Sequence, residues 1–273
     1  MFRPAHTLLM LTAATVALAA LGGCAPPMVR LDTAGVKPSA DFADLAAVLH
    51  RCVNSDGLLD LDAAAKCSDL LDAQVKKLAA CGPDTQPALF PSSEDRLAYW
   101  YNARMAWELK LVVMGKYRDE PTPAQLEEWP FVVDGKERTL SQIDMILALD
   151  DDWRVVAAAP SVRLHRAELS DKPFEAAEIR PAVLRRYEKF LGDPRRWVID
   201  IDRHSILVPP VLWRIHHAII KNFEISYRTT GATLNAALGA GLSGPARRRL
   251  QDAVGYEAVE GPSNGPLAVV AKH

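Results

Sequence analysis

The segment "PSSEDRLAYWYNARMAWELKLVVMG" (residues 91–115) predicts the strongest helix in this chain, and a helix this apolar requires a sizeable core around it. Ser92 and Asp95 have the spacing of a capping box, and Gly115 is typical of a helix end. Asn102 and Arg104 interrupt the apolar residues. A polar side chain there must be exposed or hydrogen-bonded, because burying it without a partner costs about 1–3 kcal/mol. We expect Arg104 to face solvent and Asn102 to bond the backbone of a neighbouring loop, unless both line a cleft.

Shorter helices and hairpins are predicted on both sides of that segment. Apolar residues at helical spacing indicate helices over residues 41–53 and 62–81, and two or three more within 211–254. Pro181 lies in the first turn of another helix, in which Ile179, Val183, Tyr187 and Phe190 form one stripe. A capping box of Ser141 and Asp144 opens another short helix. Asp134-Gly135 between apolar runs predicts one hairpin, and residues 195–209 predict a second that turns near residues 202–205. Together these elements predict a mostly helical α+β fold with short antiparallel strands, in a single domain over residues 41–273.

The N-terminal segment is typical of a targeting sequence. Residues 1–23 form a signal peptide whose apolar core is shorter than the ~20 residues of a membrane-spanning helix. The ending "LGGC" resembles a bacterial lipobox, in which Cys24 becomes the acylated first residue. Residues 24–40 then form the lipidated N-terminus and a Pro-rich tether. Since Ala25 rather than an aspartate follows, we expect an exported protein anchored by lipid on the periplasmic face of the outer membrane. A plain signal peptide is the alternative.

The charge of the chain argues against nucleic acid as a partner. Its 32 basic and 34 acidic side chains are interspersed and give a formal charge of -2. The basic cluster "ARRRL" (residues 246–250) lies within a helical pattern, which favours a solvated face. The expected partners are therefore the membrane, through the lipid, and an envelope ligand or protein. We expect no cofactor.

Three cysteines follow Cys24, and export would place them in an oxidising compartment. If residues 62–81 form one helix, Cys67 and Cys81 are too far apart for a bridge, which needs alpha carbons within ~7 Å. A disulfide between Cys52 and Cys67 is therefore the preferred pairing. The spacing of the cysteines fits no zinc site.

The stretch "RVVAAAPSVRLHRAEL" (residues 154–169) has the plan of a buried strand that surfaces into a polar loop, where chemistry often lies. The apolar run 155–159 predicts the strand, and Pro160 ends it. Ser161 and His165 are candidates for the nucleophile and base of a serine hydrolase. A serine needs direct contact with its base and a third group to orient that base, and no G-x-S-x-G motif surrounds Ser161.

Two further sets of residues are of the types that bind metals or act as bases. Asp200, Asp202 and His204 alternate, so a strand would point all three to one side, where they could bind a divalent metal. Asp is also favoured in hairpin turns, which would break the alternation. His216 falls on the apolar stripe of its predicted helix, and there a core histidine with one satisfied nitrogen is more common than a ligand or base.

Four stretches occur in the order and approximate spacing of one known family: "VNSDGLLDL", "LAYWYNARMAWELKLV", "VDGKERTLSQIDMIL" and "WRVVAAAPSVRLHRAELSDKPF". Over residues 42–223 the chain resembles the family named domain of unknown function 547. The matching positions are Trp100, Asn102, Ala103, Gly135, Leu140, Ser141 and Ile143. The resemblance implies an α+β fold for which a distant papain-like or transglutaminase-like relationship has been suggested.

The chain departs from that family where thiol chemistry would lie. Arg154 and Leu169 keep the two ends of the family's strand-to-loop segment. Within it, Val156 stands at the histidine, and Ser161 and Arg166 stand at the two cysteines. Elsewhere, Met145 replaces another histidine and Met105 an asparagine. Thiols ionise near pH ~8.5 and are strong nucleophiles. These replacements therefore remove any chemistry that depends on a thiolate.

We therefore expect a binding domain that has lost the family's chemistry. The residues expected to line its cleft are Asn102, Arg104, Arg154, Ser161, His165 and Arg166. Such a cleft favours an anionic or peptide-like ligand. One alternative is a hydrolase of envelope material that uses Ser161, or a metal held by Asp200, Asp202 and His204. Another is an architectural lipoprotein without a cleft.

Overall fold

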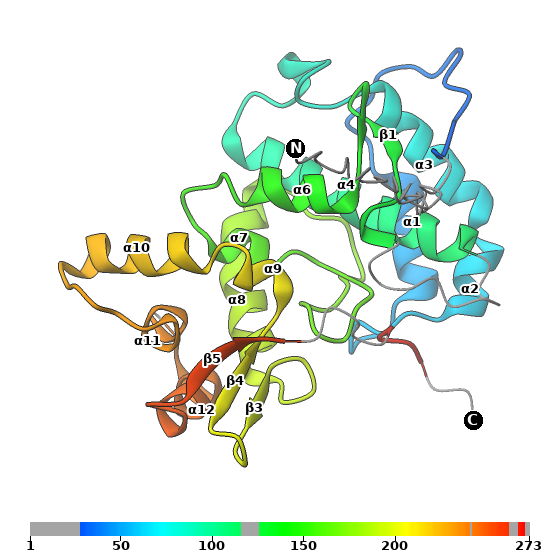
Figure 1. Cartoon of the computed structure of the whole chain (residues 1–273). Helices are drawn as coiled ribbons and strands as arrows, with labels where there is room; N and C mark the ends of the chain where they lie inside the picture. The colour runs from blue at the N-terminus through cyan, green and yellow to red at the C-terminus, as the bar shows by residue number, and fades with distance from the viewer. Residues whose placement is uncertain (1–27, 116–125, 241, 262–266, 271–273) are drawn as a thin grey trace, which may run out of the picture.

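The computed structural model describes residues 28–115, 126–240, 242–261 and 267–270, and helix α4 (Ser93–Met114) runs through its centre (Figure 1). All residues from 97 to 112 are buried, including the polar side chains of Asn102, Arg104, Glu108 and Lys110. The predicted capping box is confirmed, since Ser92 Oγ accepts a hydrogen bond from the Asp95 N–H at 3.0 Å. Gly115 follows the last helical residue.

Three N-terminal helices precede α4: α1 (Ala43–Cys52), α2 (Leu61–Lys66) and α3 (Ser68–Ala80). Helices α2 and α3 pack against α4, and α1 packs on α3 and α2. The single helix expected over residues 62–81 is wrong. Cys67 interrupts it, because its backbone (φ -95°, ψ 14°) leaves the helical path and turns the chain. Asp60 rather than Asp62 caps α2, and its Oδ1 accepts from the Ala63 N–H at 3.0 Å.

Both predicted hairpins are confirmed. Strands β1 (Phe131–Val133) and β2 (Lys136–Arg138) are joined by Asp134 (φ 52°) and Gly135 (φ 68°), and two positive φ values define a tight type I′ turn. Strands β3 (Val198–Asp200) and β4 (Ser205–Val208) form the second hairpin. Strand β5 (Glu257–Glu260) then pairs with β4 in parallel, so the expectation of antiparallel strands is incomplete. The helices between β4 and β5 supply the long connection that parallel pairing needs.

Two expectations are wrong in the segment that joins the hairpins. Helix α6 (Leu140–Leu147) begins with a capping box of Thr139 and Gln142, not of Ser141 and Asp144. Residues 154–159 form no strand, because helix α7 (Arg154–Ala157) occupies their place. The apolar run is buried throughout, and complete burial gives the same pattern for a strand and for a helical turn.

The remaining helices complete the fold. They are η1 (Pro87–Leu89), η2 (Ala176–Glu178), α8 (Ile179–Gly192), α9 (Pro210–Trp213), α10 (His216–Tyr227), α11 (Leu234–Gly239) and α12 (Gly244–Asp252). The predicted stripe of α8 is buried. Helix outweighs strand, at 51% against 11%, which confirms the mostly helical α+β class. Within the described ranges, no helix has the length and hydropathy to cross a membrane.

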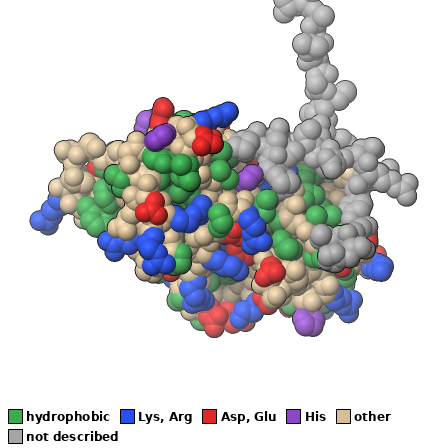
Figure 2. Space-filling model, turned by 90° about the horizontal axis from the view of Figure 1, so that it is seen from below, with side chains coloured by type: hydrophobic (Ala, Val, Ile, Leu, Met, Phe, Trp, Pro, Cys, Tyr) green, Lys and Arg blue, Asp and Glu red, His purple; other side chains and the backbone are tan. Residues whose placement is uncertain are grey.

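The surface mixes charges of both signs, as the sequence predicts (Figure 2). The cluster at residues 246–250 divides in two. Arg249 donates to the carbonyl oxygens of Leu191 (2.7 Å) and Trp197 (2.6 Å), while Arg247 and Arg248 are exposed. One of its three arginines therefore ties α12 to the rest of the fold.

The predicted signal peptide and Cys24 lie outside the described residues. The tether expected to reach residue 40 is not wholly separate from the domain. Val29 donates its N–H to the Pro130 carbonyl at 3.0 Å and forms a β-bridge with Phe131. Because Val29 is only 6% exposed, it belongs to the folded domain.

Candidate functional site

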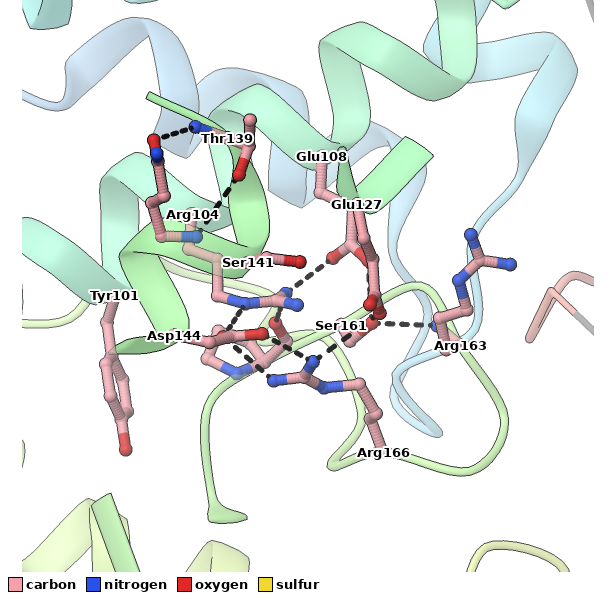
Figure 3. A network of polar contacts seen from close by, with 12 residues as sticks. Tyr101, Arg104, Glu108, Glu127, Thr139, Ser141, Asp144, Ser161, Arg163 and Arg166 are labelled. Atoms are coloured by element: carbon pink, nitrogen blue, oxygen red, sulfur yellow. Dashed lines mark hydrogen bonds and ion pairs between the residues drawn. The ribbon is translucent and has the colours of Figure 1, made fainter. Parts of the chain in front are cut away.

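A buried ionic network lies at the centre of the region that the sequence singles out (Figure 3). The Asp144 carboxylate accepts from Arg104 Nε at 2.7 Å and from Arg166 Nη1 and Nη2 at 2.8 and 3.0 Å. Arg104 is 0% exposed, so the expectation that it faces solvent is wrong. Its charge is buried because two carboxylates, Asp144 and Glu108, pair with it.

The network remains charged at neutral pH. Burial alone would raise the pKa of Asp144, but the guanidinium groups of Arg104 and Arg166 lower it to about 2. Burial alone would likewise lower the pKa of Arg104, whereas Asp144 and Glu108 raise it above its ordinary value. Arg104 and Arg166 are thus occupied by internal carboxylates, so they offer little to an external anion.

Ser161 belongs to the same network. Its Oγ donates to Glu108 Oε1 at 2.7 Å and accepts from the Arg163 N–H at 3.1 Å. The other Glu108 oxygen accepts from Arg104 Nη1 at 2.9 Å. Ser161 is 0% exposed, and His165 lies half-buried further along the loop. The hydroxyl is therefore neither held against an imidazole nor open to a substrate.

Three arginines hold the loop that carries Ser161. Arg104 Nη1 donates to the Pro160 carbonyl at 2.6 Å, Arg186 Nε to Ala158 at 3.0 Å, and Arg196 Nη1 to Arg166 at 2.8 Å. Burial lowers the pKa of both Arg186 and Arg196. Buried carbonyls in an irregular loop need such donors, because no neighbouring strand or helix supplies them. The loop is thus a rigid part of the framework.

Sequence reasoning missed the anionic half of this network. Glu108 lies one helical turn after Arg104, a spacing that favours an ion pair, and this signal was present in the sequence. Asp144 was expected to cap a helix. Arg186 and Arg196 carry no local signal, because their partners are carbonyls of a distant loop.

Asn102 fulfils the structural role expected of it. Its Nδ2 donates to the Phe174 carbonyl at 2.9 Å, and its Oδ1 accepts from the Phe174 N–H at 2.8 Å. The side chain is 0% exposed, so Asn102 fixes a loop instead of lining a cleft.

Of the six expected cleft residues, Arg154 lines an open groove. The groove has a volume of about 380 Å³ and is lined by Asp151, Asp152, Trp153, Arg154, Asn222, Phe223, Ser226, Tyr227, Ala237 and Ala240. Arg154 Nε donates to Asp152 Oδ1 at 2.7 Å, and its side chain is 32% exposed. The single cleft of six residues is therefore wrong, because Arg104, Ser161 and Arg166 are internally paired and Asn102 is buried.

The other candidate positions do not converge. Strand β3 ends at Asp200, whose Oδ1 accepts from the Arg203 N–H at 3.0 Å, and Asp202 and His204 lie in the turn. The turn therefore breaks the alternation, as the preference of Asp for hairpin turns indicates, and the three residues do not continue along one strand. Across the described ranges, no three His, Cys, Asp or Glu side chains gather as metal ligands would. His216 is half-buried and stacks on Trp213.

The residues that stand at the family's histidine, asparagine and cysteine positions also lie in different places. Val156 and Met105 are buried in the core, while Met145 is 58% exposed. Ser161 and Arg166, at the positions of the family's two cysteines, both reach the buried network. At the two positions where the resemblance implies thiols, the chain therefore has side chains that bind buried carboxylates.

The two cysteines expected to pair lie side by side. Cys52 Sγ and Cys67 Sγ are 3.7 Å apart, and both are buried thiols without a disulfide bond between them. Burial raises the pKa of the Cys52 thiol to about 12, with a further contribution from Cys67. Cys81 is a separate buried thiol.

Comparison of this chain with known protein families, with curated proteins and with solved structures gave no match. The papain-like relationship implied by the resemblance thus finds no support.

Proposed function

We propose that this protein is a lipid-anchored protein of the cell envelope whose domain binds a peptide-like ligand and performs no thiol or serine chemistry. On this proposal the domain is a divergent relative of the domain of unknown function 547 family. The loss of chemistry is supported by Ser161, which is 0% exposed and donates its hydroxyl proton to a carboxylate that an arginine already neutralises.

The observation that carries the binding function is Arg154 in its open groove. Asp152 orients the guanidinium through Nε, and the side chain remains 32% exposed, so its terminal nitrogens can meet a ligand in the groove. Phe223 and Tyr227 stack with ring centroids 4.6 Å apart and give the groove an aromatic wall. A volume of about 380 Å³ is within the range of small-ligand sites.

The charges around the groove favour a peptide over a simple anion. Asp151 and Asp152 carry two negative charges beside the one positive charge of Arg154. A ligand that offers only a carboxylate would be repelled by both aspartates. A peptide end offers a carboxylate for Arg154 together with N–H groups for the aspartates.

The proposed anchor would hold the domain close to the membrane. Four residues, 25–28, separate Cys24 from Val29, which is hydrogen-bonded to the domain through Pro130. Five steps of at most ~3.6 Å each keep Val29 within about 18 Å of the acylated residue. A ligand within reach of such a domain is a component of the envelope itself.

Calorimetric titration with soluble peptidoglycan stem peptides tests the proposal, each peptide being supplied as the free acid and as the amide. We expect the free acid to bind, and Arg154→Ala to weaken it by roughly tenfold or more, as for the loss of one charge-assisted hydrogen bond. The matched control is Arg203→Ala, whose side chain is 83% exposed outside the groove. Unchanged affinity of Arg154→Ala for every ligand found would refute the assignment.

A second candidate function, an architectural lipoprotein, is favoured by one observation. Asn102, at the centre of the resemblance, is completely buried, and both ends of its amide bond the backbone of Phe174. If no stem peptide binds the wild-type protein, and the protein instead sediments with whole envelopes independently of Arg154, this second candidate replaces the first.

A further inference from the structure

Residues 267–270 lie between two loops that are far apart in the sequence (Figure 1, red, near the C-terminus). On one side, the Ala268 carbonyl accepts from the Leu59 N–H and the Val270 N–H donates to the Leu59 carbonyl, each at 3.0 Å. On the other side, the Ala268 N–H donates to the Val162 carbonyl at 2.7 Å. The segment is therefore an inserted strand that is hydrogen-bonded along both edges.

The wall formed by Leu59 is built without that strand. Leu59 forms an antiparallel bridge with Val53, and the next residue, Asp60, donates its N–H to the Cys52 carbonyl at 2.7 Å. The turn between them packs tightly, since a Cβ on Gly57 would lie 2.5 Å from Glu168 Cβ. Leu59 is consequently fixed by its own loop.

The opposite wall is equally independent. The Val162 N–H donates to Glu108 Oε2 at 3.2 Å, and the Ser161 N–H to the Ala167 carbonyl at 3.0 Å. Arg196 holds the same loop through the Arg166 carbonyl. Both walls are thus preformed, and a preformed site loses less entropy when a ligand binds.

Besides these hydrogen bonds, Leu267 forms an antiparallel bridge with Arg163 and packs at the edge of the core, but the strand buries little else. Of its four side chains only Ala268 is buried, at 4% exposure, while Val270 is 40% exposed. Leu267 and Val269 are half-buried. Segments with few buried apolar contacts open locally far more often than the core unfolds. When this one opens, the N–H and carbonyl of Leu59 and the carbonyl of Val162 lose their partners.

We propose that the slot between Leu59 and Val162 is a binding site for an extended strand of a partner protein, and that residues 267–270 occupy it until they are displaced. The partner binds by strand addition, in which backbone hydrogen bonds supply the affinity. Selectivity comes from the position of Ala268, where only a small side chain fits, with aliphatic residues on either side as in "LAVV". This site is separate from the groove at Arg154 and does not depend on the function proposed for that groove.

A pair of variants in the full chain tests the proposal. Ala268→Glu places a long charged side chain at the buried position and expels the strand, whereas Val270→Glu changes an exposed side chain and leaves the strand in place. The probe is a capped peptide, acetyl-GPLAVVAK-amide, which has no terminal carboxylate for Arg154. We expect it to bind Ala268→Glu at least tenfold more tightly than the wild type or Val270→Glu. Equal affinity for all three proteins, or binding to none, would overturn the proposal.

Amide hydrogen exchange of the wild type supplies a measurement that needs no variant. We expect the N–H groups of Leu59, Ala268 and Val270 to exchange together and at least a hundredfold faster than those in the middle of α4. If they exchange only at the rate of α4, the strand never leaves and the proposal fails. If the wild type dimerises and Ala268→Glu does not, the occupant is a second copy of the chain, which overturns the assignment to a partner.

Discussion

Replacing Asp144 with asparagine removes the charge at the centre of the buried network without changing the size of the side chain. Arg104 and Arg166 direct three hydrogen bonds of 2.7–3.0 Å at this carboxylate, and all three residues are at most 7% exposed. Breaking a buried ion pair by removing one partner costs about 3–5 kcal/mol, because the remaining charge is left uncompensated. A domain of ordinary stability has about 5–15 kcal/mol in total, so Asp144→Asn should lose a large part of it.

Urea denaturation at pH 7 measures this loss, with Glu178→Gln as the control. Glu178 is 63% exposed and 3.8 Å from Lys172, so its loss should change the free energy of unfolding by less than about 1 kcal/mol. Removing one of the two cations as well, in Asp144→Asn with Arg166→Met, should recover part of the loss. A loss below about 1 kcal/mol in Asp144→Asn would show that water reaches the network, and would refute the conclusion that it is framework.

Three further predictions concern the same region and the cysteines. The pKa of Asp144 is about 2 in the folded protein, against an ordinary value of 3.8. The stability that its charge supplies is therefore nearly complete above pH ~4 and is lost as the pH falls toward 2. This contribution to the free energy of unfolding is worth about 2 kcal/mol. The urea midpoint of the wild type should therefore fall between pH 5 and 2.5, and the part of that fall due to Asp144 should be missing in Asp144→Asn. Ser161→Ala should lower the free energy of unfolding in urea by about 1–3 kcal/mol, since buried Glu108 loses a donor; no loss would mean that the bond to Glu108 is not formed. In protein recovered from an oxidising compartment, peptide mapping without reductant should find Cys52 linked to Cys67 and Cys81 unlinked. The bond should form before the core closes, because burial suppresses the attacking thiolate of Cys52, and a map with Cys81 in the disulfide would contradict this pairing.

The elements that the sequence predicts correctly are those with local causes. The capping box of Ser92 and Asp95 and the turn at Asp134-Gly135 depend on a few neighbouring residues. The buried stripe of α8 follows from spacing alone. The break at Cys67 and the helix at residues 154–157 were missed, because apolar sequence is compatible with either outcome and packing against other elements decides it.

The sequence identified several residues of the candidate site but did not predict how they are arranged. Arg104, Ser161 and Arg166 do lie together, yet the carboxylates that bind them come from Glu108 and Asp144. These are 53 and 22 residues away from their partners Ser161 and Arg166. The spacing of Arg104 and Glu108 indicates their ion pair, but nothing in the sequence near Arg104 reveals that Asp144 also reaches it. Sequence alone therefore located a polar centre and could not distinguish an open cleft from a closed network.

Labelling of the purified soluble domain with serine-directed and cysteine-directed activity probes tests the central claim most directly. If Ser161 is a buried member of an ionic framework, the serine-directed probe should label the wild type no more than it labels Ser161→Ala, and the cysteine-directed probe should label neither while the protein remains folded. Stoichiometric labelling of the folded wild type that disappears in Ser161→Ala would contradict the account.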